Sequence, residues 1–213
     1  MTDAHYHRGD GTFLSVRGRE YAFAGTHPWR AEEFDSGRLR ALLSANPDLG
    51  VGEIGLDRLR TKTVPDVQRS VFKAQLELAA EFSRPVVLHG AKCWGEVVKA
   101  CMPFAGRIPA FLFHGFSRSD GLLPDIAAIN GFVSVGKSVL NGHAVNYRNL
   151  VCRIPADRLL AESDCDVDAG DNPIAEVISK ISDLTRVSES VLAENAARFV
   201  EALALSSETE DGR

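Results

Sequence analysis

Short apolar runs alternate with amphipathic helical segments through most of this 213-residue chain. The segments between the runs repeat apolar residues at the i, i+3, i+4 and i+7 spacing of one helix face. Strands that alternate with helices pair in parallel, and the helices cover the sheet. The pattern therefore constrains the chain to an α/β fold. Buried strands are expected at 49–54, 85–89, 109–114, 131–135 and 158–163.

Residues 1–25 depart from this rhythm. A first strand ends in His5-Tyr6-His7, and residues 12–16 and 20–25 are two further expected strands with only three residues between them. A parallel crossover needs about a dozen residues, so this pair is predicted to be an antiparallel hairpin. The total of eight strands fits a closed TIM-like (β/α) barrel that is shortened or distorted near its N-terminus. An open doubly wound sheet is the alternative, although no GxGxxG or GxxxxGK motif supports a nucleotide-binding version of it.

The expected helices carry ordinary start signals. Asp66 is predicted to cap a long helix that runs through Phe82, and Ser188 is predicted to cap a late one. Between these, Asn172 and Pro173 are predicted to be the N-cap and the first residue of a helix.

Composition bounds the kind of protein. A length of 213 residues with 45% hydrophobic content suits one core, so 1–205 is expected to form a single domain and the polar stretch 206–213 a disordered tail. The net charge of −5 argues against a large basic surface. No apolar run reaches the roughly 18 residues of a membrane span, and the N-terminus lacks a signal-peptide pattern. We therefore expect a cytoplasmic protein without a membrane partner or an obligate protein partner.

Cysteine and serine chemistry finds little support in the sequence. The four cysteines have no CxxC spacing, so neither a disulfide framework nor a structural zinc site is expected. No serine lies in a Gly-x-Ser-x-Gly elbow, so a Ser-His-Asp hydrolase is not favoured.

Histidines and carboxylates stand where the expected strands end, which is where a β/α barrel carries its chemistry. In a strand, residues i and i+2 point to the same side, so His5 and His7 can face one point. Four histidines and two carboxylates can bind two divalent cations with one carboxylate as a bridge, and such a pair activates water for phosphoryl or acyl transfer. A hydrogen-bonded core histidine and a structural ion pair are the alternatives for the single residues. The candidates are His5, His7, Glu53, His89, His114 and Asp164.

Two more carboxylates lie beside these candidates. Asp57 either joins the site or caps the turn after the fourth strand. Glu162 shares a strand face with Asp164, but Asp164 is expected to stand nearer the barrel mouth.

These segments, in this order, resemble the TatD family of metal-dependent hydrolases. The combination of Gly-Glu-Ile-Gly-Leu-Asp with a His-x-His start is specific, whereas each histidine alone is weak evidence. The resemblance covers nearly the whole chain. The matching stretches are 3–7, 25–29, 52–57, 68–79, 85–89, 114–117, 159–164 and 194–199.

The resemblance implies an amidohydrolase-like β/α barrel with two divalent metals, and hydrolytic activity that in several members is deoxyribonuclease activity. By position, one metal would take His5, His7, Glu53 and Asp164, and the other would take Glu53, His89 and His114. Glu53 and Asp164 are thus the candidate catalytic residues. Glu53 would bridge the two metals, and Asp164 would also orient or deprotonate the attacking water. Zinc, manganese, magnesium, iron and nickel are the candidate cations.

The resemblance also suggests substrate contacts. His27 would line the pocket as a substrate or phosphate contact, and a turn histidine before Pro28 is the alternative. Many members carry an arginine after the fifth-strand histidine, where this chain has Gly-Ala and then Lys92. Lys92 and Arg118 are the candidate replacements.

The leading hypothesis is therefore a TatD-like, deoxyribonuclease-like hydrolase whose substrate is DNA. A small ester, amide or phosphomonoester substrate is the first alternative, because one scaffold hosts many substrates. A non-catalytic binding protein on the same barrel is the second.

Overall fold

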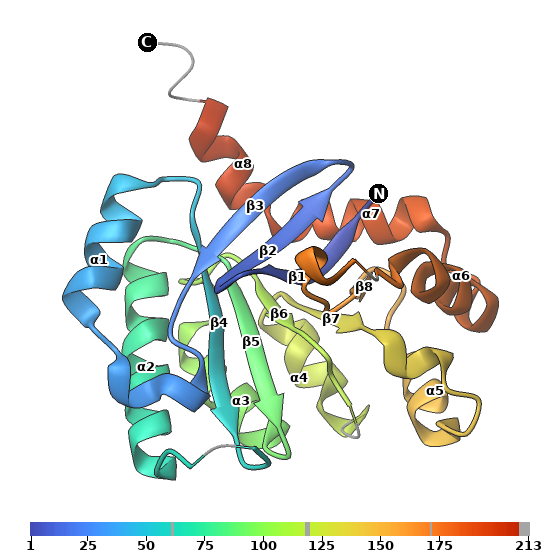
Figure 1. Ribbon diagram of the computed structural model, residues 1–213, viewed down its shortest axis with the longest axis horizontal. Helices are drawn as coiled ribbons and strands as arrows, with labels where there is room; N and C mark the ends of the chain where they lie inside the picture. Colours follow the sequence, from blue (N-terminus) through green and yellow to red (C-terminus); the bar gives the residue numbers. More distant parts are fainter. Residues whose placement is uncertain (61, 118–119, 171, 209–213) are drawn as a thin grey trace.

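One eight-stranded sheet, with its strands in chain order, organises the protein (Figure 1). The computed structural model describes residues 1–60, 62–117, 120–170 and 172–208. All eight expected strands are present, with small differences at their ends. They are β1 (Asp3–Arg8), β2 (Gly11–Val16), β3 (Arg19–Ala24), β4 (Gly50–Asp57), β5 (Val86–Ala91), β6 (Phe111–Phe113), β7 (Gly131–Val135) and β8 (Leu159–Ala161).

The first three strands are antiparallel, and the rest of the sheet is parallel. β2 and β3 form the predicted antiparallel hairpin, with Gly18 at φ +90° in the connection. β1 also pairs antiparallel with β2, because only Gly9 and Asp10 separate the two strands. Each pair from β3 to β8 is parallel. The short connections near the N-terminus thus replace the helical crossovers of a regular β/α barrel.

The sheet curls into a nearly closed barrel because β1 meets the segment that follows β8. The backbone N–H of Asp164 donates to the carbonyl of His5 at 3.0 Å, and the N–H of His7 donates to the carbonyl of Cys165 at 2.8 Å. His7 also forms a parallel bridge with Asp166. The predicted barrel is confirmed, and the open doubly wound alternative is wrong.

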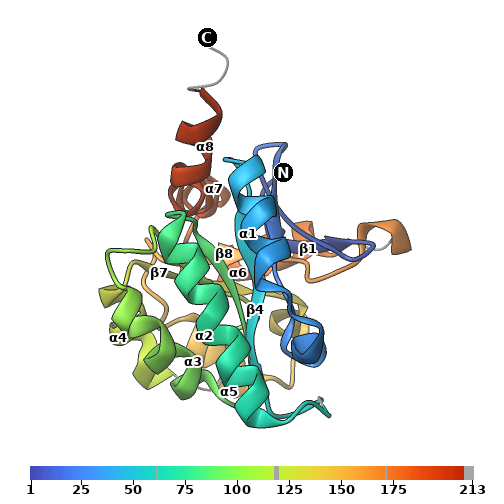
Figure 2. The same ribbon diagram turned by 90° about the vertical axis from the view of Figure 1, so that its left-hand side faces the viewer.

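Helices cover the outside of the parallel strands. Figure 2 shows α2 running alongside β4 with α1 next to it. The helices are α1 (Ser36–Ala45), α2 (Pro65–Glu81), α3 (Trp94–Cys101), α4 (Leu123–Ala128), α5 (Val145–Val151), α6 (Ile174–Thr185), α7 (Glu189–Phe199) and α8 (Glu201–Glu208). Short 3₁₀ segments are η1 (Pro28–Glu33), η2 (Met102–Phe104), η3 (Asp120–Leu122), η4 (Lys137–Leu140) and η5 (Val167–Ala169). Among the described helices, none has the length and apolar character needed to cross a bilayer.

Two of the three predicted helix starts hold with small shifts. The predicted Asp66 cap is wrong, because α2 begins at Pro65 without a side-chain cap and Asp66 lies in its first turn. The hydroxyl of Ser188 accepts from the N–H of Val191 at 3.4 Å, as predicted. α6 begins at Ile174, one residue later than predicted, and the side chain of Asn172 accepts from the N–H of Ile174 at 3.0 Å. Of the predicted tail 206–213, residues 206–208 belong to α8, and 209–213 lie outside the described residues.

Because side chains alternate between the two faces of a strand, several polar side chains point into the barrel interior. Three strands carry an interior apolar residue that is followed two positions later by a polar one, because side chains alternate between the faces of a strand. The pairs are Val87 and His89 in β5, Leu112 and His114 at the end of β6, and Leu160 and Glu162 at the end of β8. The interior apolar residues pack against Phe199 and neighbouring side chains of α7, which closes the interior below the polar layer.

β4 breaks this alternation. Its register with β5 shifts between Val51 and Ile54, and both of these side chains pack in the outer cluster between sheet and helices. A register shift of this kind re-aims a side chain. Here it turns Glu53 toward the barrel interior.

Candidate metal centre

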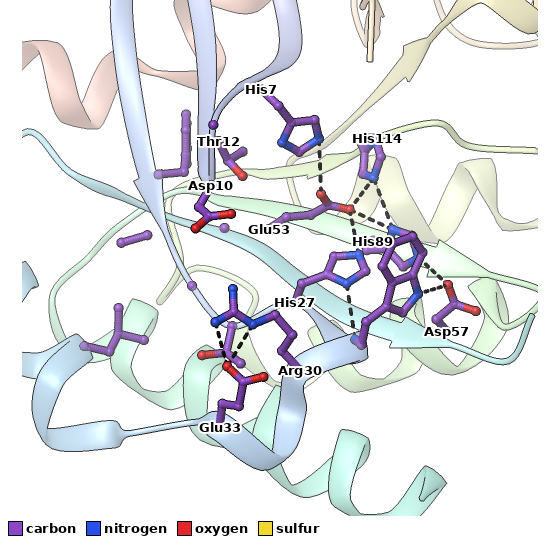
Figure 3. A pocket seen from close by; sticks show the side chains of 18 of the residues that line it. His7, Asp10, Thr12, His27, Arg30, Glu33, Glu53, Asp57, His89 and His114 are labelled. Atoms are coloured by element: carbon purple, nitrogen blue, oxygen red, sulfur yellow. Dashed lines mark hydrogen bonds and ion pairs between the residues drawn. The ribbon is translucent and has the colours of Figure 1, made fainter. Parts of the chain in front are cut away.

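Glu53 lies at the centre of a ring of imidazoles (Figure 3). Its Oε1 atom is 2.6 Å from Nε2 of His114 and 2.7 Å from Nδ1 of His89. Its Oε2 atom is 3.5 Å from Nε2 of His5 and 3.9 Å from Nε2 of His7. The carboxylate is buried, with 7% of its surface exposed. Its two oxygens therefore face two different pairs of histidines.

Asp164 completes the group on the side of His5 and His7. Its Oδ1 atom is 3.8 Å from Nε2 of each of these histidines. Its backbone has φ +49° and is held by the hydrogen bond to the His5 carbonyl that closes the barrel. The half-exposed side chain lines a cavity of about 960 Å³ that also contains Glu53. All six predicted ligand residues thus come together at the barrel mouth.

The geometry around His5 fits a divalent cation. Both ring nitrogens of His5 are buried, and neither has a hydrogen-bond partner among the described residues. Leaving such atoms unpaired costs free energy. Two ligand atoms bound at ~2.1 Å to one cation lie roughly 3.0–3.9 Å apart. The distances of 3.5 and 3.8 Å from Nε2 to the two carboxylates fall in this range. These residues therefore suit a shared cation better than direct hydrogen bonds.

The buried charges are strongly coupled. Burial by itself raises the pKa of Glu53, but the positive charge of the nearby His114 and its hydrogen bond, together with the closeness of His27 and His5, hold that pKa well below its usual value. Burial opposes protonation of His114, yet Glu53 and Glu162 raise the pKa of His114 well above its usual value. Burial and the adjacent His114 lower the pKa of His5. Glu53 is thus ionised, as a metal ligand must be.

Asp57 binds four donors with its two oxygens. Oδ1 accepts from the backbone N–H groups of Leu59 at 2.6 Å and Arg60 at 2.8 Å, so Asp57 does cap the turn. Oδ2 accepts from Nε1 of Trp29 at 2.6 Å and contacts Nε2 of His89 at 3.0 Å. Burial raises the pKa of Asp57, but hydrogen bonds from Arg60, Trp29, Leu59 and His89 outweigh burial and lower it to about 2.

With a cation between His89 and Glu53, an ionised Asp57 would accept the Nε2 proton of His89, and the Nδ1 lone pair would be free to bind that cation. Asp57 therefore orients a candidate ligand in addition to capping the turn. The sequence alone left these two roles as alternatives.

His27 lies next to the candidate ligands but turns Nε2, and not Nδ1 as His89 does, toward Glu53. Its Nδ1 atom accepts from the backbone N–H of Trp29 at 3.2 Å, and its ring thereby caps η1. The proton must then be on Nε2, which is 3.5 Å from Oε1 of Glu53. This arrangement makes His27 a hydrogen-bond donor toward the cavity.

The structure confirms neither of the two predicted basic substrate contacts, Lys92 and Arg118. Lys92 is exposed, with φ +58°, and is not among the cavity-lining residues. Arg118 lies outside the described residues. Arg30 and Arg60 line the cavity instead, and Arg30 pairs with Glu33 at 2.6 Å.

Sequence reasoning named Glu162 but did not predict that it contacts His114. Glu162 is buried, accepts a hydrogen bond from the hydroxyl of Ser134, and has Oε2 3.8 Å from Nδ1 of His114. Asp164 stands nearer the mouth than Glu162, as expected from their positions on one strand face. A second buried acid two residues before a candidate ligand was the available signal for a partner of His114.

Comparison with known proteins identifies relatives. The family model described as TatD related DNase matches residues 14–204. The 3'-5' ssDNA/RNA exonuclease TatD of Pectobacterium carotovorum subsp. carotovorum (strain PC1) is 32% identical over 148 residues, which are 68% of this chain and 57% of that protein. The uncharacterized metal-dependent hydrolase YabD of Bacillus subtilis (strain 168) is 30% identical over 148 residues, covering 68% of this chain and 58% of YabD. The matches thus span less than two thirds of these relatives.

Solved structures share the fold. YJJV, a TatD homolog from Escherichia coli K12, superposes with a TM-score of 0.73 and 24% identity, covering 86% of this chain and 76% of YJJV. An uncharacterized amidohydrolase from Saccharomyces cerevisiae superposes with a TM-score of 0.68 and 16% identity, covering 86% of this chain and 80% of that one. At these identities the likeness is one of fold.

Proposed function

This chain belongs to the family of TatD-related DNases, and on that premise we propose that it is a metal-dependent hydrolase that cleaves phosphodiester bonds of nucleic acid at a site for two divalent cations. The observation that carries the proposal is the division of the Glu53 carboxylate between two sets of imidazoles. Oε2 faces His5 and His7, while Oε1 lies within hydrogen-bond distance of His89 and His114. A carboxylate with this placement is suited to bridge two cations.

The ligand sets follow from this division. Glu53, Asp164, His5 and His7 would hold one cation, and Glu53, His89 and His114 would hold the other. The unpaired nitrogens of His5 support the first set, and the orientation of His89 by Asp57 supports the second. Bound divalent cations lower the pKa of water and neutralise charge on a phosphoryl oxygen.

Asp164 is the candidate general base. Its side chain is 44% exposed and faces the cavity, so a water molecule can reach it, unlike the buried Glu53. The nearby His7 and the neighbouring His114 and His5 offset the effect of burial and lower the pKa of Asp164, so it is ionised and able to accept a proton. The Nε2–H group of His27 is directed to donate a hydrogen bond to a phosphoryl oxygen.

The test compares metal content and hydrolysis in matched variants. Protein purified without chelator is analysed for metals, and wild type, Glu53→Gln and Asp164→Asn are assayed on short single-stranded DNA. Glu53→Gln is expected to lose bound metal, and Asp164→Asn to lose roughly 10²- to 10⁴-fold in rate, the usual contribution of a general base. Asp125→Asn, on the exposed surface of α4, is the control.

Three outcomes would contradict parts of the proposal. Protein that stays metal-free in excess zinc, manganese and magnesium would exclude the metal centre. Equal rates in wild type and in Asp164→Asn would exclude Asp164 as the base. No turnover of any substrate with metal bound would favour a non-catalytic binding protein.

The position of Lys92 favours a second candidate function. Because Lys92 lies outside the cavity lining, the cavity lacks the cation expected after the fifth-strand histidine. A small ester, amide or phosphomonoester needs fewer phosphate contacts than a nucleic acid. Metal-dependent turnover of such compounds, with none of DNA or RNA, would select this alternative.

A further inference from the structure

We propose that Trp29, Leu59 and Arg60 form a nucleobase subsite beside the metal centre, where a base adjoining the scissile phosphate of single-stranded DNA or RNA stacks on the indole. This inference rests on the proposed phosphodiesterase function and deepens it. All three residues line the cavity that contains Glu53 and His89.

The apolar side chains of this subsite are unusually exposed for their type. Trp29 is 48% exposed and Leu59 54%, whereas Trp94, the other tryptophan, is 5% exposed in the core. Leu42, at 39% exposed, lines the same cavity. Exposed apolar groups that gather in one concave site mark a ligand surface more often than a solvent surface.

The indole is fixed in place before any ligand arrives. Its Nε1–H donates to Asp57 at 2.6 Å, and its backbone N–H donates to His27 at 3.2 Å. Its ring packs edge-to-face on the imidazole of His27, with 4.6 Å between centroids and 77° between planes. A side chain that has already lost its rotamer freedom binds a flat partner with a smaller entropic cost.

The carboxylate of Asp57 contacts both this subsite and the candidate metal ligand His89. Asp57 holds the indole and His89 with Oδ2, and holds the backbone of Leu59 and Arg60 with Oδ1. The ring centroids of Trp29 and His89 are therefore only 6.3 Å apart. A phosphate at the metal centre thus brings its attached nucleoside close to the indole.

The chemistry of the subsite favours a nucleobase over a plain apolar group. An indole ring can stack on the face of any nucleobase. The side chain of Arg60 is exposed, and its guanidinium is suited to bind a flanking phosphate. Bases in a duplex are already stacked and paired, so the subsite is expected to accept single strands preferentially.

Fluorescence tests the subsite without requiring turnover. In the Mg²⁺-loaded protein, dAMP is expected to quench Trp29 emission, whereas deoxyribose 5-phosphate, which has no base, is not. Trp29→Phe retains only the buried Trp94 as a fluorophore and is expected to show no quenching by dAMP. Equal quenching by the two phosphates, or equal quenching in Trp29→Phe, would overturn the subsite.

Kinetics on short single-stranded DNA test its use. Trp29→Ala is expected to raise KM roughly 5- to 100-fold, in line with the loss of one base–aromatic stack, and Trp29→Phe is expected to recover most of this loss. An abasic site next to the scissile phosphate is expected to raise KM similarly in wild type and to have no further effect in Trp29→Ala. Met102→Ala, at an exposed apolar side chain outside the cavity, is the control.

The two proposals fail in different ways. Quenching by dAMP without cleavage of any nucleic acid would overturn the phosphodiesterase function and support the base subsite. Cleavage with KM values that ignore both Trp29→Ala and the abasic site would support the function and overturn the subsite. Turnover of small aromatic esters that depends on Trp29, without any response to dAMP, would also overturn the nucleobase assignment.

Discussion

Replacing Asp57 with asparagine tests the central structural argument, because the substitution keeps the shape and changes only the hydrogen-bonding capacity. The carboxylate serves four donors, from Trp29, Leu59, Arg60 and His89, at 2.6–3.0 Å. An amide oxygen can accept about two of these, and the amide nitrogen can accept none. At least two donors therefore lose their acceptor in Asp57→Asn.

The expected magnitude follows from this count. A donor left without an acceptor costs about 1–3 kcal/mol. His89 can become an acceptor instead, which leaves the Trp29 donor unpaired, so the unfolding free energy is expected to fall by about 1–3 kcal/mol. The two short backbone hydrogen bonds keep the amide oxygen at Leu59 and Arg60, which turns the amide nitrogen toward His89. His89 must then accept at Nε2 and carry its proton on Nδ1, the nitrogen 2.7 Å from Glu53.

A protonated Nδ1 cannot bind a cation. Loss of such an orienting partner typically weakens metal affinity 10- to 100-fold. The assay is calorimetric titration of metal-free protein with Zn²⁺ or Mn²⁺, with thermal unfolding measured in parallel. Asp157→Asn, at an exposed carboxylate, controls for the charge change. Trp29→Phe is a second control, since it removes one donor from Asp57 but keeps the hydrogen bond between Asp57 and His89, and it is expected to leave metal affinity unchanged.

The reasoning would be refuted by Asp57→Asn protein that binds metal within twofold of wild type. Unchanged thermal stability would separately refute the claim that four donors depend on this carboxylate. A loss of affinity in Trp29→Phe as large as in Asp57→Asn would show that the indole, and not the tautomer of His89, controls the site.

Three further predictions concern stability and metal. Gly55→Ala is expected to destabilise the protein by more than ~3 kcal/mol in denaturant unfolding, because the backbone φ is +148° and the new Cβ would lie 2.0 Å from the His89 carbonyl oxygen. Gly95 in α3 has open space around it, so Gly95→Ala is expected to stabilise the protein by roughly 0.5–1 kcal/mol. On α1, Leu43→Ala is expected to cost ~2–5 kcal/mol because the side chain is fully buried, whereas a comparable loss in Leu42→Ala, at 39% exposed, would contradict the assigned helix face. Removing the metal with a chelator is expected to lower the melting temperature, and adding the metal back is expected to raise it again, because a ligand that binds only the folded state stabilises that state. A melting temperature that does not change in either step would argue against a cation in this site.

Much of the fold was predictable because local patterns determine it. The strands β5 to β8 begin as or consist of short apolar runs, and each main helix repeats apolar residues on one face. The connection between β2 and β3 is too short for anything except a hairpin. Small errors arose at helix starts, as at Asn172 and Pro173, where neighbouring residues compete for the cap.

The candidate ligands were also predictable, for a related reason. Parallel strands all end at the same edge of the sheet, so polar residues that follow apolar runs in sequence must gather in space. His89 and His114 arrive by simple strand alternation from the interior residues Val87 and Leu112. The sequence alone therefore determined the identity of the six residues that meet at the barrel mouth.

Only the tertiary structure decided how these residues face one another. Glu53 points inward because of a register shift between β4 and β5, which depends on pairing between strands and leaves no mark in the periodicity. Asp164 reaches His5 only because the two ends of the barrel join through their backbones. The proton positions on His27 and His89 depend on partners brought in by other segments, Trp29 and Asp57. Hydrogen-bond direction and side-chain aim are properties of contacts between distant segments, and a linear sequence does not contain them.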